Sequence, residues 1–320
     1  MIVTLTANPA IDRTIELTGA LRRGDVQRAA RSDVQAGGKG VNVSRALAAS
    51  GVETLAVFPA AADDAFTRLV AASGLPHLAV PVTGTVRTNI AVTEPDGTTT
   101  KLNEPGPRLD EAELDALGAA VVAACRGAAW LVIAGSLPAG LPANTYTTLV
   151  SRVRSELGAA APRIAVDSSG APLRHLVHGD EPIDLIKPNA EELAELAGHG
   201  DPEALEASPE LAARIATESL GAARAALVTL GATGALLVES GGARFAASPR
   251  IRAVSTVGAG DSSLAGFLLA SAEGQGTDGA LAQAVAQGAA AAALPGSTLP
   301  ARADTRPENI TITDVSTRTR

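Results

Sequence analysis

The stretch RIAVDSSGAPLRHLVHGDEPIDLIKPNAEELAEL, residues 163–196, decides the fold class. Two short apolar runs, RIAVD and IDLIK, each end in polar residues and lead into a helical pattern. A third run of this kind, ALVTLG, occupies residues 226–231. Such alternation is typical of βαβ units, in which helices join parallel strands. The stretch therefore predicts an α/β fold with a mainly parallel central sheet and helices on both faces.

The same rhythm extends over most of the chain. We expect further strands at IVTLT (2–6), VETLAVF (52–58) and AWLVIAG (129–135). We expect helices at GVNVSRALAAS (40–50) and LDEAELDALGAAVVAAC (109–125). RIRAV (250–254) is interpreted as a strand and SLAGFLLASAEG (263–274) as a helix. With no long linker between these segments, residues 1–320 are expected to form a single domain.

Two segments depart from this rhythm. Residues 12–38 and 85–107 alternate polar and apolar side chains with period two, and the second contains a PDG turn. Such patterns favour β-hairpins. We expect a small β-sheet over the strand ends, a candidate lid built from about 12–36 and 84–104; an edge extension without function is the alternative. The tail ITITDVSTRTR (310–320) is expected to add an edge strand and then fray.

Composition excludes several classes of function. Aromatic residues are 2% of the chain and the net charge is −8, which disfavours nucleic acids and anionic membranes as partners. The single cysteine, Cys125, permits no intramolecular disulfide and is expected to be a small buried hydrophobe. Neither a signal peptide nor an apolar run long enough for a membrane helix is visible. We therefore expect a soluble, cytoplasmic protein with a core of Ala, Val and Leu.

The segment STVGAGDSS (255–263) carries the strongest chemical signal. Backbone amides of a glycine-rich turn at a helix start can form an anion hole, here at Gly258, Ala259 and Gly260. Asp261, directly after them, can accept a proton from a substrate hydroxyl, as phosphoryl transfer requires. The alternative is that Asp261 only caps the helix. The segment is not a Walker P-loop, nor is the Gly38-Lys39 pair, because Gly40 follows it.

Two segments near the N-terminus could contact a ligand. In AGGKGVNVSRAL (36–47), Gly37 and Gly38 allow backbone to approach a ligand closely, and Lys39 and Asn42 add polar groups. This segment could also be an ordinary turn. In TANPAID (6–12), the carboxylate of Asp12 could hold two sugar hydroxyls.

Other candidates suit a phosphate, a metal and a nucleotide. Arg87 and Lys101, on the candidate lid, could bind the phosphate of a sugar phosphate, or could be plain surface charges. Lys187, Asn189 and Glu192 lie in IKPNAEEL, where an Asn and a Glu three residues apart at a helix start could hold a hydrated Mg²⁺. In VTLGATGALLV (228–238) we single out the residues of a loop small enough for a nucleotide: Thr229, Gly231 and Gly234.

Taken together, these motifs resemble the ribokinase-like (pfkB) family of carbohydrate kinases. AGGKGVNVSRAL is similar to its N-terminal signature and STVGAGDSSLAGF to its C-terminal one. Between them AGSLPAGLP, DSSGAPL, KPNAEEL and VTLGATGAL occur in the family's order and spacing. TLTANPAIDRTIEL (4–17) looks most like the branch that acts on fructose 1-phosphate. The resemblance implies a ribokinase-like fold with a small β-sheet lid, and a homodimer paired through that lid.

The resemblance also implies an ATP-dependent phosphoryl transfer with Mg²⁺. Asp261 would be the base and the amides of 258–260 the anion hole. Matching positions would hold the sugar hydroxyls (Asp12, Gly38, Asn42) and the substrate phosphate (Arg87, Lys101, Ser136). Another set would face the nucleotide and metal: Lys187, Asn189, Glu192, Thr229, Gly231 and Gly234. Ser255 replaces the Asp or Asn of many relatives at a cation loop, which leaves K⁺ activation open.

We expect phosphorylation of fructose 1-phosphate to fructose 1,6-bisphosphate. Tagatose 6-phosphate and fructose 6-phosphate are the alternative substrates, because the same site geometry fits them. A sugar-phosphate-binding protein without catalysis is an alternative of another class, although the base and the glycines are intact. A dinucleotide-dependent oxidoreductase is disfavoured, because TANPAID and not G-x-G-x-x-G follows the first strand.

Overall fold

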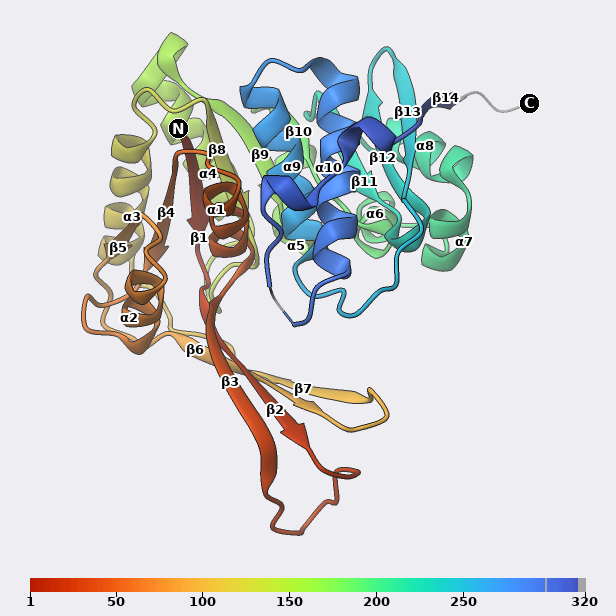
Figure 1. The fold of residues 1–320 in the computed structure, drawn as a ribbon. Helices are drawn as coiled ribbons and strands as arrows, with labels where there is room; N and C mark the ends of the chain where they lie inside the picture. The colour runs from red at the N-terminus through yellow and green to blue at the C-terminus, as the bar shows by residue number, and fades with distance from the viewer. Residues whose placement is uncertain (297, 316–320) are drawn as a thin grey trace.

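A ten-stranded sheet forms the centre of the molecule (Figure 1). The computed structural model describes residues 1–296 and 298–315. Seven neighbouring strands of this sheet run parallel to one another, and the three at one edge, residues 234–239, 242–247 and 312–315, pair antiparallel. In spatial order they are β14 (Ile312–Val315), β13 (Gly242–Ala247), β12 (Gly234–Glu239), β11 (Ala225–Thr229), β10 (Leu185–Ile186), β9 (Arg163–Asp167), β8 (Trp130–Ala134), β1 (Ile2–Thr6), β4 (Thr54–Pro59) and β5 (His77–Val80). The predicted mainly parallel sheet is confirmed.

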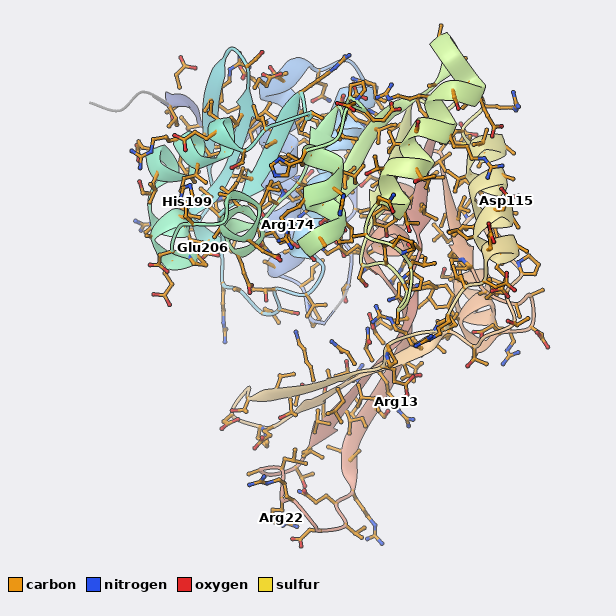
Figure 2. The ribbon with its side chains drawn as sticks, turned by 180° about the vertical axis from the view of Figure 1, so that it is seen from behind. Arg13, Arg22, Asp115, Arg174, His199 and Glu206 are labelled. Carbon is orange, nitrogen blue, oxygen red and sulfur yellow. The ribbon has the colours of Figure 1, made fainter. Side chains whose placement is uncertain are left out.

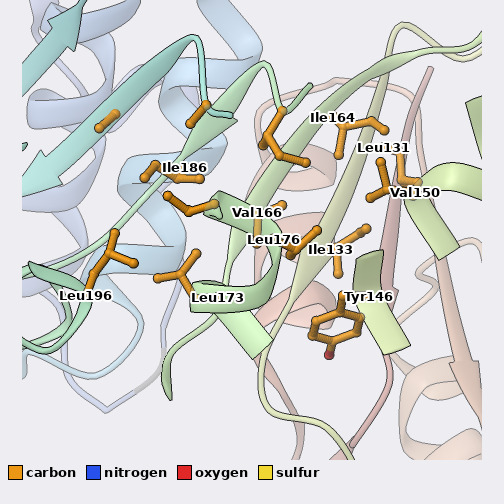
Figure 3. Packing of buried hydrophobic residues seen from close by; sticks show 14 of the residues in the cluster. Leu131, Ile133, Tyr146, Val150, Ile164, Val166, Leu173, Leu176, Ile186 and Leu196 are labelled. Atoms are coloured by element: carbon orange, nitrogen blue, oxygen red, sulfur yellow. The ribbon is translucent and has the colours of Figure 1, made fainter. Parts of the chain in front are cut away.

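Helices cover both faces of this sheet, as predicted. On one face pack α1 (Lys39–Ala49), α9 (Ala259–Ala272) and α10 (Gly276–Ala292). On the other lie α3 (Glu111–Ala124), α4 (Thr145–Leu157), α5 (Gly170–Val177), α6 (Ala190–Ala197), α7 (Pro202–Ala207) and α8 (Pro209–Glu218). Figure 3 shows this second layer, where Leu131, Ile133 and Val166 from the strands meet Val150 and Leu176 from the helices. The helix α2 (Ala65–Ala72) packs beside β5, near the base of a second sheet.

That second sheet, which we call the flap, projects from the body (Figure 1). Its order is β3 (Ala29–Gly37), β2 (Ala10–Leu17), β6 (Arg87–Thr93) and β7 (Thr99–Asn103). In Figure 2, the label Arg13 lies on β2, and the label Arg22 lies on the loop between β2 and β3, at the far end of the flap. The hairpin of β6 and β7 turns at the predicted PDG, where Gly97 has φ 92° and the Thr98 amide donates to Asp96 Oδ1. The predicted small β-sheet is confirmed.

The register gives the flap two chemically different faces. Residues paired across strands point to the same side, and neighbours along a strand alternate. One row consists of Gln35, Asp12, Asn89 and Asn103, and a further row on that side includes Thr14 and Lys101. The opposite side carries Val34, Arg13, Ile90 and Leu102 in one row, and Ile15 and Val92 in the next. The flap is therefore polar on one face and mostly apolar on the other.

One predicted strand is wrong and another is confirmed. Residues 250–254 form no strand, because both edges of β13 are already paired, with β12 and β14. The Val254 and Ser255 amides donate instead to the Ala292 carbonyl oxygen. The predicted C-terminal edge strand is β14; the fraying expected beyond it falls on 316–320, outside the described residues. Within 1–296 and 298–315, no helix is long and apolar enough to span a membrane.

Candidate active site

Asp261 lies in the first turn of α9 and is almost fully buried. The helix starts at Gly258, whose φ of 76° is left-handed and favours glycine. Asn42 of α1 donates its Nδ2 hydrogen to Asp261 Oδ2 at 2.9 Å. Burial, and then the negative charge of Asp167, raises the pKa of Asp261 to about 6. The carboxyl group is therefore a stronger proton acceptor than an exposed aspartate, yet remains ionised at neutral pH.

Backbone amides and a lysine surround the start of α9. The first amides of a helix lack intrahelical acceptors and attract anions. The Ala259 amide makes a long bond of 3.3 Å to the Thr256 carbonyl oxygen. A Cβ on Gly260 would lie 3.4 Å from Lys187 Nζ, so this ammonium group stands directly against the glycine turn. The predicted anion hole thus has a cation beside it.

Two lysines and two carboxylates gather next to the base. Lys39 Nζ donates to Asp167 Oδ1 at 2.7 Å and to Glu192 Oε1 at 3.0 Å. Lys187 Nζ lies 3.1 Å from Asp167 Oδ2. Burial would lower the pKa of Lys39, but the charges of Asp167 and Glu192 outweigh burial and raise it. The network joins the start of α1, the end of β9 and the start of α6.

Asp12 lies on the polar face of the flap, close to its base. Asn89 Nδ2 donates to its Oδ1 at 3.0 Å. A Cβ on Gly37, which pairs with Ala10, would come within 1.9 Å of Asp12 Oδ2, so this position of the carboxylate requires a glycine at 37. Burial raises the pKa of Asp12, while Asn89 and the charges of Arg87, Arg45 and Lys101 oppose that rise. Three cations therefore face the position predicted to hold sugar hydroxyls.

Arg87 and Ser136 meet at Asn8. Arg87 donates to the carbonyl oxygens of Glu104 at 3.1 Å and Asn8 at 3.3 Å. Asn8 Nδ2 in turn donates to Ser136 Oγ at 3.3 Å. Arg87 Nε and Asn8 Oδ1 are buried and have no hydrogen-bond partner within the described residues. Buried polar atoms without partners are rare, which marks this corner as a place for a polar ligand.

The residues predicted for the nucleotide gather at the ends of β10 and β11. Asn189 and Thr229 form a parallel β-bridge. Asn189 also caps α6 through a capping box. Its side chain accepts from the Glu192 backbone amide, and Glu192 Oε2 accepts from the Asn189 backbone amide at 3.0 Å. Gly231 is exposed on the turn that follows β11. Packing alone requires a glycine at position 234, because a Cβ there would lie 2.1 Å from the Ala246 carbonyl oxygen.

Comparison with known proteins agrees with this geometry. The model of the pfkB family of carbohydrate kinases matches residues 5–304. The chain belongs to this family. A 1-phosphofructokinase of Rhodobacter capsulatus is 35% identical over 277 residues, covering 85% of this chain and 84% of the relative.

Solved structures of phosphofructokinase-2 from Escherichia coli resemble this pfkB kinase over most of its length. The complex with fructose-6-phosphate has a TM-score of 0.82 at 30% identity, covering 95% of this chain and 96% of the other. The tetrameric inhibited form has a TM-score of 0.80 at 32% identity, with coverages of 92% and 95%. The resemblance inferred from the motifs is therefore confirmed.

Catalysis in the pfkB family implies Mg²⁺, and Glu192 fits a hydrated ion better than a directly bonded one. Both of its oxygens already accept hydrogen bonds, from Lys39 and from the Asn189 amide. The side chain is 13% exposed, so a second lone pair of each oxygen can accept from metal-bound water. Among the described residues, no three acidic, histidine or cysteine side chains are arranged to hold a metal.

Asn8, Arg45 and Asn89 are not among the site residues predicted from the sequence of this kinase, and Asp167 is predicted only as the polar residue that ends the RIAVD strand. Two signals were available. Asn89 follows Arg87 by two residues, so strand alternation places both on one face. Arg45 follows Asn42 by three, which places the two on neighbouring turns of α1. No sequence signal pairs Asn8 with Ser136, or Asp167 with Lys39.

Proposed function

We propose that this chain is an ATP-dependent 1-phosphofructokinase that converts fructose 1-phosphate to fructose 1,6-bisphosphate. The observation that carries the proposal is the buried Asp261, held by Asn42 at the start of α9 with its pKa raised to about 6. A base of this kind next to a glycine turn suits proton abstraction from a hydroxyl. The similarity to the R. capsulatus 1-phosphofructokinase supports the choice of substrate.

Asp261 takes the proton of the sugar C6 hydroxyl as that oxygen attacks the γ-phosphorus of ATP. A bond forms between the hydroxyl oxygen and the phosphorus. The bond from the phosphorus to the β,γ-bridging oxygen breaks, and ADP leaves. Charge that develops on the transferred group is stabilised by the amides of 258–260 and by Lys187, whose ammonium lies against Gly260.

Sugar and phosphate occupy the corner between α1 and the flap in this proposal. Asp12, Gly38 and Asn42 hold sugar hydroxyls, with Gly37 and Lys39 completing that side of the site. The substrate phosphate is bound by Arg87, Lys101 and Ser136. Arg87 Nε is buried and has no hydrogen-bond partner among residues 1–296 and 298–315, which supports this assignment because a buried N–H donor without an acceptor is unfavourable. Lys101 lies on the polar face of the flap and contributes through charge.

ATP occupies the ends of β10 and β11, against Lys187, Asn189, Thr229, Gly231 and Gly234. Mg²⁺ would neutralise phosphate charge when it is bound, and Glu192 would be the residue that holds its hydration shell. Activation by K⁺ at the loop that contains Ser255 is tested by comparing the activity in KCl with the activity in choline chloride.

We further propose a homodimer that pairs through the flap. Leu102 and Val34, on the mostly apolar face, are 59% and 45% exposed. Apolar surface gathered in one place on a projecting sheet favours a protein partner. A second copy of the chain, presenting the same face, would cover it.

The test is kcat/KM with ATP and Mg²⁺ for fructose 1-phosphate, fructose 6-phosphate and tagatose 6-phosphate, side by side. We expect a clear preference for fructose 1-phosphate. The second candidate is a kinase for a ketohexose 6-phosphate, favoured by the likeness to the E. coli phosphofructokinase-2 solved with fructose-6-phosphate. A preference for a 6-phosphate would support that candidate. Tight binding without ATP turnover would instead indicate a binding protein.

A further inference from the structure

Each of the two carboxylates next to the base is ion-paired with a lysine of the chain itself. Asp167 is wholly buried, with Oδ1 2.7 Å from Lys39 Nζ and Oδ2 3.1 Å from Lys187 Nζ. Glu192 accepts Lys39 on Oε1 at 3.0 Å and the Asn189 amide on Oε2 at 3.0 Å. Asp167 Oδ1 and both Glu192 oxygens therefore accept hydrogen bonds, whereas Asp167 Oδ2 is ion-paired with Lys187 but accepts no hydrogen bond within the described residues.

The Lys39 ammonium stands where a bridging cation would balance this pair. Its one nitrogen contacts an oxygen of each carboxylate, and the side chain reaches them from a different element, the start of α1. Two carboxylates that converge on one point suit a hard divalent cation. Here a covalently attached positive charge takes that position, and a metal ion would have to displace it.

We propose that Lys39 acts as a resident cation that keeps free divalent metal off Asp167 and Glu192, so that metal reaches Glu192 only together with a nucleotide. Lys39 is thus a positioning residue: it controls metal binding by occupying the oxygens of Asp167 and Glu192 that face it. The inference rests on the proposed function in one respect, since it takes Glu192 as the carboxylate that faces the metal of the nucleotide.

Removal of the Lys39 charge should expose a metal site that the native chain lacks. In Lys39→Met, Lys187 alone would balance Asp167, Glu192 and the nearby Asp261. We expect the variant to bind one Mn²⁺ per chain, without nucleotide or sugar, at least about tenfold more tightly than the wild type. Binding is measured by the loss of the electron paramagnetic resonance signal of free Mn²⁺ on titration of the full chain.

Two variants separate this effect from a general one. Lys39→Arg keeps a cation against the carboxylates and should bind Mn²⁺ as weakly as the wild type. Arg174→Met removes a cation from another carboxylate, because Arg174 Nη1 lies 3.0 Å from Glu195 Oε1. Both side chains of this pair are exposed, Arg174 being labelled in Figure 2, and Arg174→Met should gain no tight site.

The inference is overturned if the wild type binds Mn²⁺ as tightly as Lys39→Met, if that variant gains no site, or if Arg174→Met gains as much. Lys39→Gln replaces Lys39→Met if the latter does not fold. If neither folds, the wild type decides: tight Mn²⁺ binding only with ADP present supports the inference, and tight binding without ADP overturns it. Because the titrations contain no sugar, they are unaffected if fructose 1-phosphate proves not to be the substrate.

Discussion

Asp261 is the residue on which the proposed chemistry depends. Replacement by Asn keeps the shape and a hydrogen-bonding group beside Asn42 but removes the proton acceptor. We expect Asp261→Asn to lower kcat by about 10²–10⁴-fold, with the KM for fructose 1-phosphate changed little. Steady-state kinetics test this, with binding of the sugar phosphate measured by calorimetry as the control for folding. Turnover close to the wild-type value would exclude Asp261 as the base.

The pH profile tests the environment of the same carboxylate. A base works only when ionised, so kcat/KM should fall as the pH drops through about 6, to which burial and Asp167 raise the pKa of Asp261. The hydrogen bond from Asn42 favours the ionised form. Its loss in Asn42→Ala should therefore move the acid limb of kcat/KM to higher pH. The phosphate of the substrate also titrates near this pH, but it does so equally for the wild type and Asn42→Ala. The test is therefore the difference between the acid-limb pKa values of the two enzymes.

At the scale of elements, the contact between β2 and β3 fixes how Asp12 is presented. A Cβ on Gly37 would lie 1.9 Å from Asp12 Oδ2 and 2.4 Å from its Cγ. Gly37→Ala should therefore displace the carboxylate and raise the KM for the sugar phosphate on the order of tenfold, with the melting temperature nearly unchanged. Gly241→Ala is the control, because a Cβ there meets nothing within 4 Å and its φ is not left-handed. Equal KM values for both variants would show that Asp12 does not hold the sugar.

The elements also show which parts of the site were predictable from sequence. Asp261 and Glu192 could be proposed as candidates because their patterns are local: a glycine turn directly before a helix, and an Asn and a Glu three residues apart at a helix start. The strand predicted at RIRAV is wrong, because the preceding strand β13 already pairs with β12 and β14 and leaves no edge for residues 250–254 to extend. The contacts of Lys39 were not predictable, since they join residues 128 and 153 positions apart. Candidate residues with a local sequence pattern could thus be predicted, whereas contacts between residues far apart in the chain could not.

At the scale of the whole molecule, the flap would connect the proposed site to the proposed dimer. Its polar face carries Asp12, Asn89 and Lys101, and the mostly apolar face lies on the other side of the same strands. A partner bound to that second face would hold the first in place over the body. Pairing through the flap would therefore support substrate binding as well as stability.

The flap interface can be tested with one charge. Leu102→Asp puts a carboxylate on the mostly apolar face, where burial in an interface without a partner is unfavourable. We expect the wild type to elute as a dimer in size-exclusion chromatography with light scattering, and Leu102→Asp as a monomer with a raised KM for the sugar phosphate. Leu78→Asp places the same charge on β5, where Leu78 is 38% exposed, and should leave the dimer intact. A dimer that survives Leu102→Asp, or a wild type that is monomeric at the concentrations used for light scattering, would contradict assembly through this face.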